Sequence, residues 1–185
     1  MLCHTAAMDS GRATSLSEYT TERLLLRRFT ADDAPFVLAV HQHPDLVRFV
    51  PSCAQRTLGE AQEWIASVIE TQTPGRGWWC VVTADGVPIG AVVLKPIPPS
   101  AGHDQQDIEI GWRQHPSFTG HGYITEAAAA ILTEAFGSGL TRVVAVTDPE
   151  NVRSQRVCQR LGMTHLGSTH RYYDQQLELF VATAD

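Results

Sequence analysis

The feature that most constrains this chain is a Gly-x-Gly turn, Gly120-His121-Gly122, between an alternating segment and an alanine-rich one. Residues 107–112 (DIEIGW) alternate polar and apolar side chains, as a half-buried strand does. The segment after the turn, up to about Phe136, is rich in helix formers with apolar residues at helical spacing. Glycines let a backbone approach a ligand closely, and a helix start adds unpaired N–H groups and a positive dipole end. The arrangement therefore predicts a cradle for a phosphate or pyrophosphate, with a plain strand-to-helix connection as the alternative.

The composition is typical of one globular domain without disulfides. The chain has 185 residues, 43% of them hydrophobic, which is enough for a buried core, and it contains no apolar run long enough to cross a bilayer. Twenty acidic and fourteen basic residues give a formal charge of −6, which argues against a broad nucleic-acid surface. Four scattered cysteines without a CxxC pair argue against a zinc site and favour a reducing cytoplasm.

The N-terminal segment, 1–18, lacks the basic start and the apolar run of a signal peptide. We expect it to be a flexible tail ahead of a single domain, 19–185. Whether Met1 or Met8 is the natural start is open. The paired histidines, His41 and His43, have no third ligand near them in the sequence, so we expect a surface loop there and no metal site.

Alternating apolar runs and helical stripes predict an α/β chain. Two helix starts carry capping boxes, Thr30 with Asp33 and Thr57 with Glu60. Asp85-Gly86 separates two β-rich runs and predicts a hairpin. We expect strands at 20–29, 78–83, 87–94, 107–112, 143–147, 163–174 and 175–182, and helices at about 30–41, 57–71, 123–136 and 148–161. The order β-α-α-β-β-β-α-β-α-β-β predicts a mixed, largely antiparallel sheet flanked by helices.

Four segments in this order resemble the GNAT superfamily of acetyl-CoA-dependent N-acetyltransferases. They are TERLLLRRFTADD, EIGW with HPSFTGHGYITEA, PENVRSQRVCQRLGM and RYYDQQLELF. The likeness covers about 20–182 and is greatest to the Rim-type branch, the ribosomal-protein N-terminal acetyltransferases. It implies a GNAT-like fold for the single domain.

The resemblance also implies where acetyl-CoA binds as a co-substrate. The anion in the cradle would be the pyrophosphate of coenzyme A, and the pantetheine arm would lie beside one strand, where that strand and the next splay apart. Asn151 would contact the arm. The cofactor-binding residues implied in this way are Ile110, Gly111, Trp112, Thr119, Gly120, His121, Gly122, Tyr123, Ile124, Asn151 and Ser154.

The chain departs from the family at the group that protonates the leaving thiolate. Cys158 stands where many members carry a tyrosine, and a cysteine suits the task poorly because its pKa is close to that of the leaving thiol. Ser154, three residues after Asn151, is our candidate donor, as in the Rim-type branch. The competing interpretation is a solvated helix serine. Ser117 and Thr119 also differ from common family residues, which we expect to alter affinity only, because backbone N–H groups bind the phosphates.

An amine must be neutral to attack, so a base or a water chain should collect its proton. Glu109, on the strand beside the expected gap, is our first candidate, and the alternative is a structural partner for an arginine. The backbone N–H near Trp112 would stabilise the oxyanion. His115 and His121 are weaker candidates for the base.

Two further groups of residues, a pair of tyrosines and a set of arginines, are candidates for contact with a ligand. Tyr172 and Tyr173 lie on a late strand that often lines the acceptor site in the family. Arg153, Arg156 and Arg160 share a helical face and suit either the 3′-phosphate of coenzyme A or solvent.

The sequence thus predicts an acetyl-CoA-dependent N-acetyltransferase that works by direct attack in a ternary complex. The acceptor would be a primary amine, on a protein N-terminus or a small molecule, and the acidic chain mildly favours a cationic one. We expect no metal, nucleic-acid or membrane partner, and a monomer or homodimer. A non-catalytic acyl-CoA-binding or sensing module is the alternative, because the family's tyrosine is missing.

Overall fold

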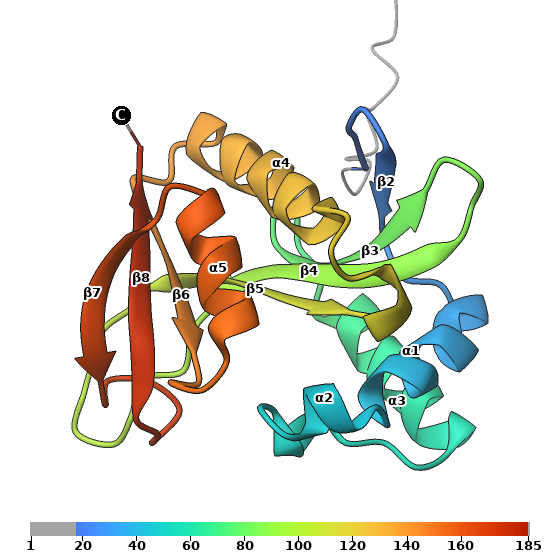
Figure 1. The fold of residues 1–185 in the computed structure, drawn as a ribbon, viewed down its shortest axis with the longest axis horizontal. Helices are drawn as coiled ribbons and strands as arrows, with labels where there is room; N and C mark the ends of the chain where they lie inside the picture. The colour runs from blue at the N-terminus through green and yellow to red at the C-terminus, as the bar shows by residue number, and fades with distance from the viewer. Residues whose placement is uncertain (1–17, 185) are drawn as a thin grey trace, which may run out of the picture.

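The computed structural model describes residues 18–184, which form a single mixed sheet with helices on both faces (Figure 1). All but the last residue of the expected tail, 1–18, lies outside the described residues. The strands are β1 (Tyr19–Thr20), β2 (Leu24–Arg27), β3 (Gly77–Thr83), β4 (Pro88–Pro96), β5 (Ile108–Gln114), β6 (Arg142–Thr147), β7 (Thr164–Thr169) and β8 (Leu177–Thr183). The helices are α1 (Ala34–His41), α2 (Pro44–Val47), α3 (Leu58–Glu70), α4 (Tyr123–Gly137) and α5 (Val152–Arg160), with 3-10 turns at Ala31–Asp33, Pro51–Cys53 and Pro116–Phe118.

The sheet order is β1-β2-β3-β4-β5-β6-β8-β7, and every neighbouring pair is antiparallel except β5 with β6. This confirms the predicted mixed, largely antiparallel sheet. Both capping boxes form as expected, and Gly86 adopts a positive φ of 87° in the turn of the β3–β4 hairpin. No helix within 18–184 has the length and apolar character needed to span a membrane.

Three predicted boundaries were wrong, two of them because side chains bond to nearby main chain. The first strand is two short antiparallel strands, since the Thr21 hydroxyl accepts the Leu24 N–H (3.1 Å) and turns the chain. Helix α5 begins at Val152, because the Asp148 carboxylate accepts the Glu150 N–H (2.7 Å) and holds the preceding residues in a turn. Strand β7 ends early, so Tyr172 and Tyr173 lie in the loop 170–176. The structure also adds the short helix α2, which the sequence did not predict.

The two faces of the sheet bury separate cores. Helix α4 packs with Trp79, Ile110 and Phe180, whereas α1 and α3 pack with residues such as Cys80 on the opposite face. Trp78 packs partly against this second core, so the two tryptophans separate as predicted. Because side chains alternate along a strand, Ile110 and Trp112 face α4, while the odd-numbered residues of β5 face α1 and α3.

Strands β5 and β6 separate almost as soon as they meet. Their parallel pairing consists of one register position, Glu109 with Val144, although β5 pairs with β4 along its whole length. Beyond Glu109 the edge of β5 that faces β6 therefore has no strand partner. This is the splayed arrangement that the family resemblance implied.

Candidate active site

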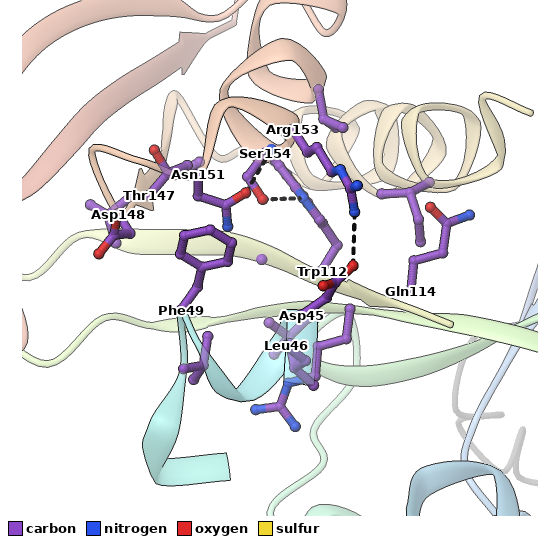
Figure 2. Close-up of a pocket in the computed structure, with 18 of the residues that line it drawn as sticks. Asp45, Leu46, Phe49, Trp112, Gln114, Thr147, Asp148, Asn151, Arg153 and Ser154 are labelled. Carbon is purple, nitrogen blue, oxygen red and sulfur yellow. Dashed lines mark hydrogen bonds and ion pairs between the residues drawn. The ribbon is translucent and has the colours of Figure 1, made fainter. Parts of the chain in front are cut away.

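A cavity of about 690 Å³ opens where β5 and β6 separate (Figure 2). This volume lies within the range of ligand sites in proteins. The cavity has one wall made by β5, β6 and the start of α5, and another made by α2 and the loop 170–176. It therefore joins segments that are more than 100 residues apart in the sequence.

The glycine turn lies just outside this cavity, next to the start of α4. Thr119 and Ile124, on either side of the turn, line the cavity, whereas residues 120–123 do not. Gly120 and Gly122 adopt φ of 86° and 77°, a left-handed conformation that glycine adopts without strain. The Glu126 N–H donates to the Gly122 carbonyl (3.0 Å), so the N–H groups of the three residues before it are not needed by the helix. The Thr119 N–H, however, donates to the Pro116 carbonyl (3.2 Å). The donors of the cradle thus begin after Thr119.

An arginine from the start of the chain braces the glycine turn. The Arg23 Nε donates to Glu126 Oε2 (2.7 Å), and its Nη1 donates to the His121 carbonyl (3.1 Å). The Thr21 hydroxyl donates to the other Glu126 oxygen (2.5 Å). Burial alone would raise the pKa of Glu126, but the hydrogen bonds from Thr21 and Arg23 outweigh it and lower the pKa. The carboxylate therefore holds the first strands against the start of α4.

The implied pantetheine side of the cavity brings three predicted residues together. The Asn151 side chain caps α5 by accepting the Ser154 N–H (3.2 Å), and the Ser154 hydroxyl accepts the Trp112 indole N–H (3.3 Å). Figure 2 shows these residues side by side. A hydroxyl that accepts one hydrogen bond can still donate its own proton, so this contact leaves Ser154 able to act as a donor. Ile110 is 2% exposed, so the surface it offers is mainly backbone.

Glu109 lies at the closed end of the gap and is 7% exposed. Its carboxylate forms an ion pair with Lys95 Nζ (2.6 Å) and accepts a hydrogen bond from the Tyr173 hydroxyl. The structural partner is therefore a lysine, not the arginine considered from the sequence. Burial and then the charge of Glu109 raise the pKa of Tyr173, which keeps the phenol protonated as a donor.

Only one of the two adjacent tyrosines lines the cavity. Tyr173 faces it with a φ of 58°, an uncommon conformation for a residue other than glycine. Tyr172 is fully buried and donates to Asp107. The loop holding both is braced by the segment 97–101, because the Tyr173 N–H donates to the Pro98 carbonyl (3.3 Å).

Helix α2 faces α5 across the cavity. Asp45 pairs with Arg153 (3.0 Å), as Figure 2 shows, and Arg48 pairs with Glu150 (2.6 Å). Arg153 thus has a carboxylate partner on the chain. Arg156 and Arg160, which share its helix, are exposed and do not line the cavity.

Comparisons with known proteins agree with this geometry. Residues 23–164 match the family model described as an acetyltransferase (GNAT) domain. The chain belongs to the GNAT acetyltransferase family. It is 29% identical over 156 residues to the uncharacterized N-acetyltransferase YnaD of Bacillus subtilis, covering 80% of this chain and 83% of that protein. It is 30% identical over 161 residues to the FsC-acetyl coenzyme A-N(2)-transacetylase of Aspergillus fumigatus, covering 83% of this chain and 68% of that protein.

A solved GNAT structure shows the same fold with its ligand. The RimL ribosomal L7/L12 alpha-N-protein acetyltransferase in complex with coenzyme A superposes with a TM-score of 0.73 at 18% identity, covering 89% of this chain and 96% of that one. The chain is therefore an acetyl-CoA-dependent N-acetyltransferase, and nothing in the comparisons favours the non-catalytic alternative. The splayed edge of β5, the glycine turn and the cavity volume all fit this co-substrate.

The cysteine at the position of the GNAT tyrosine lies outside the cavity. Cys158 is fully buried between α5 and the α4 core, and burial raises the pKa of its thiol to about 12. It cannot contact a leaving group in the cavity, whereas Ser154 lines it. His115 accepts the Ser117 N–H (3.3 Å) and His121 stacks on Tyr123, so both histidines belong to the turn.

The sequence interpretation missed a histidine–arginine pair whose arginine, Arg113, lines the cavity. His41 is 2% exposed, not in a surface loop as expected, and its Nε2 lies 2.5 Å from Arg113 Nη1. Burial, and then the charge of Arg113, lower the pKa of His41 to about 3, so the imidazole is neutral. Within 18–184, no group of three or more His, Cys, Asp or Glu side chains is placed to hold a metal. The 72-residue separation of the pair left no local signal.

Proposed function

We propose that this enzyme acetylates a primary amine by direct attack in a ternary complex, with Glu109 as the base. The observation that carries the proposal is the position of Glu109. Its buried carboxylate lies at the last point where β5 and β6 pair, next to the gap that opens beyond it. A base at that point can collect the amine proton directly or through one water.

The proposed cofactor contacts are mostly main chain. The edge of β5 at Ile110, Gly111 and Trp112 offers hydrogen bonds to an extended arm, and the turn from Gly120 to Ile124 offers N–H groups to a diphosphate. Bound acetyl-CoA supplies an acetyl group activated as a thioester. The N–H near Trp112 is the proposed donor to the oxyanion.

Two side chains complete the proposed chemistry. The Ser154 hydroxyl lines the cavity and is the proposed hydrogen-bond donor to the leaving sulfur, while the Trp112 indole N–H bonds to its oxygen and helps to position it. The Tyr173 hydroxyl and Lys95 orient the Glu109 carboxylate from the acceptor side. Glu109 thereby keeps a fixed position while one of its lone pairs remains for the incoming amine.

The variant Glu109→Gln tests this assignment. We expect kcat to fall about 100-fold, the usual size of a general-base contribution, while acetyl-CoA still binds in isothermal titration. Glu134→Gln is the matched control, since it makes the same change at an exposed carboxylate of α4 that does not line the cavity, and it should keep the wild-type kcat. A Glu109→Gln enzyme with wild-type kcat would refute the role of Glu109, and failure of acetyl-CoA to bind at millimolar concentration would refute the cofactor site.

The setting of the enzyme is also proposed. We infer that residues 19–185 act as a single domain, as a monomer or homodimer, and in the cytoplasm, since Cys80 and Cys158 are buried free thiols. The relatives act on chemically different amines, one named for a protein N-terminus and one for FsC. The choice of acceptor must therefore follow from this chain's own cavity.

A further inference from the structure

The positively charged side chains that line the cavity differ in whether they have a carboxylate partner. Arg48 and Arg153 pair with glutamate and aspartate across the cavity mouth, and Lys95 pairs with Glu109. Arg113 also lines the cavity, yet within 18–184 no carboxylate lies within ion-pair distance of it.

Arg113 is instead held by uncharged groups. Its Nη1 donates to the neutral His41 imidazole, and its guanidinium lies over the rings of Trp78 (4.6 Å) and Trp64 (5.4 Å). Burial lowers the pKa of Arg113, but a guanidinium remains charged at any physiological pH. Arg113 is half-buried, and the negative charge of Glu109 on the same strand balances it only in part, from beyond ion-pair distance. A charge that is partly desolvated and incompletely balanced is unfavourable, and aromatic rings offset only part of that penalty. The site is therefore arranged for an anion that arrives with a ligand.

The position of Arg113 indicates which ligand brings that anion. Glu109, Gly111 and Arg113 lie on the same face of β5, the face toward α1 and α3. Between the carboxylate and the guanidinium the strand carries only Gly111, which lines the cavity together with Val93 of the neighbouring strand. A Cβ on Gly111 would meet the Val93 side chain at 3.1 Å, so the surface between the two charges is apolar and consists of Val93 and backbone.

We propose that the acceptor is an amine that also carries a carboxylate, bound with its carboxylate on Arg113 and its amine toward Glu109. The inference rests on the proposed role of Glu109 in the same cavity. A planar guanidinium binds a carboxylate through two parallel hydrogen bonds, which fixes the orientation of the acceptor. A free amino acid and a peptide that begins with an acidic residue share this chemistry.

The phosphates of coenzyme A are the competing anion. The proposed phosphate donors lie at the start of α4, which covers the face of the sheet opposite to α1 and α3 (Figure 1). Arg113 is fixed on the α1 and α3 face by His41 and Trp64. The two anion sites are therefore on different faces of β5.

The experiment compares amino acids with their primary amides, which differ in charge and little in shape. Binding to the enzyme saturated with coenzyme A is measured by titration calorimetry, and turnover is measured by release of the thiol. We expect the wild type to prefer the carboxylate partner about 10- to 100-fold, the range for a hydrogen bond to a charged group. Amidation also makes the amine easier to deprotonate, so the turnover assay is biased against the proposal. Short peptides with N-terminal aspartate or asparagine form a second arm that distinguishes free amino acids from peptides.

Arg113→Met should reduce this preference to less than about threefold, and Arg113→Lys should keep part of it. Arg48→Met is the matched control, because Arg48 lines the same cavity but already has a carboxylate partner, and it should keep the wild-type preference. Equal binding of acid and amide by the wild type would overturn the proposal without any variant. The proposal would also be overturned if the Arg113→Met variant kept the preference for the acid over the amide, whether or not its affinity for coenzyme A had fallen. Binding is measured without turnover, so this result can be interpreted even if Glu109 proves not to be the base.

Discussion

One side of the cavity exposes main-chain groups, and the other side exposes charged side chains. The first side consists of the unpaired edge of β5 and the N–H groups after Gly120. The second consists of Glu109 and Arg113, each held by neighbours that are distant in the sequence. The first arrangement suits a co-substrate that never changes, since it depends on conformation and hardly on residue type. The second suits an acceptor that differs among relatives, because single substitutions alter its charge and shape.

The strongest test of the main-chain side is to remove its conformation. We expect Gly120→Val combined with Gly122→Val to weaken acetyl-CoA binding about 100-fold in titration calorimetry, because valine disfavours the positive φ that turns the N–H groups outward. The control pair is Gly86→Val with Gly139→Val, which places the same strain at φ of 87° and 97° in turns that have no cavity-lining residue next to them. Equal weakening by both pairs would mean that only general stability was lost, and the comparison would fail.

The acceptor side should respond to pH through His41, whose pKa is about 3 when folded. An unfolded histidine has a pKa of about 6.5, so the unfolded state binds the proton more tightly and stability falls as the pH drops below that value. Between pH 7.5 and 5, we expect the wild type to lose about 1 to 2 kcal/mol of unfolding free energy in urea titrations. His41→Gln should lose less over the same interval. Parallel pH profiles of the two proteins would show that the buried pair does not limit stability.

The smallest effect should come from the side chain that assists the main-chain side. We expect Ser154→Ala to lower kcat about tenfold, the value of one hydrogen bond to a charged group, with acetyl-CoA affinity changed less than about twofold. Ser67→Ala, an exposed serine on α3, serves as the control. If Ser154→Ala reduced acetyl-CoA affinity more than the glycine pair does, the proposed distinction between the two sides of the cavity would be wrong.

The same division explains what could be predicted from the sequence. The glycine turn, the helix caps and the β3–β4 hairpin each depend on local backbone chemistry, and each was predicted. The position of Glu109 beside the gap followed from the family resemblance, because the separation of β5 and β6 is a property of the fold.

The acceptor side could not be predicted, because its contacts are non-local. His41 reaches Arg113 across 72 residues, and Tyr173 reaches Glu109 across 64. Neither pair has a spacing or a periodicity that a single sequence reveals. The expected surface position of His41 was wrong. Although the His41 side chain is polar, the packing of α1 on the sheet buries it.

The single β5–β6 register position also determines how the two parts of the sheet are connected. Across that seam the backbone ladder is almost interrupted, so β1 to β5 and β6 to β8 form two plates joined chiefly by packing under α4 and α5. In the binding mode that we propose, the extended arm of the co-substrate takes the place of the missing backbone hydrogen bonds. The acetyl donor would then connect the two parts of the sheet for as long as it is bound.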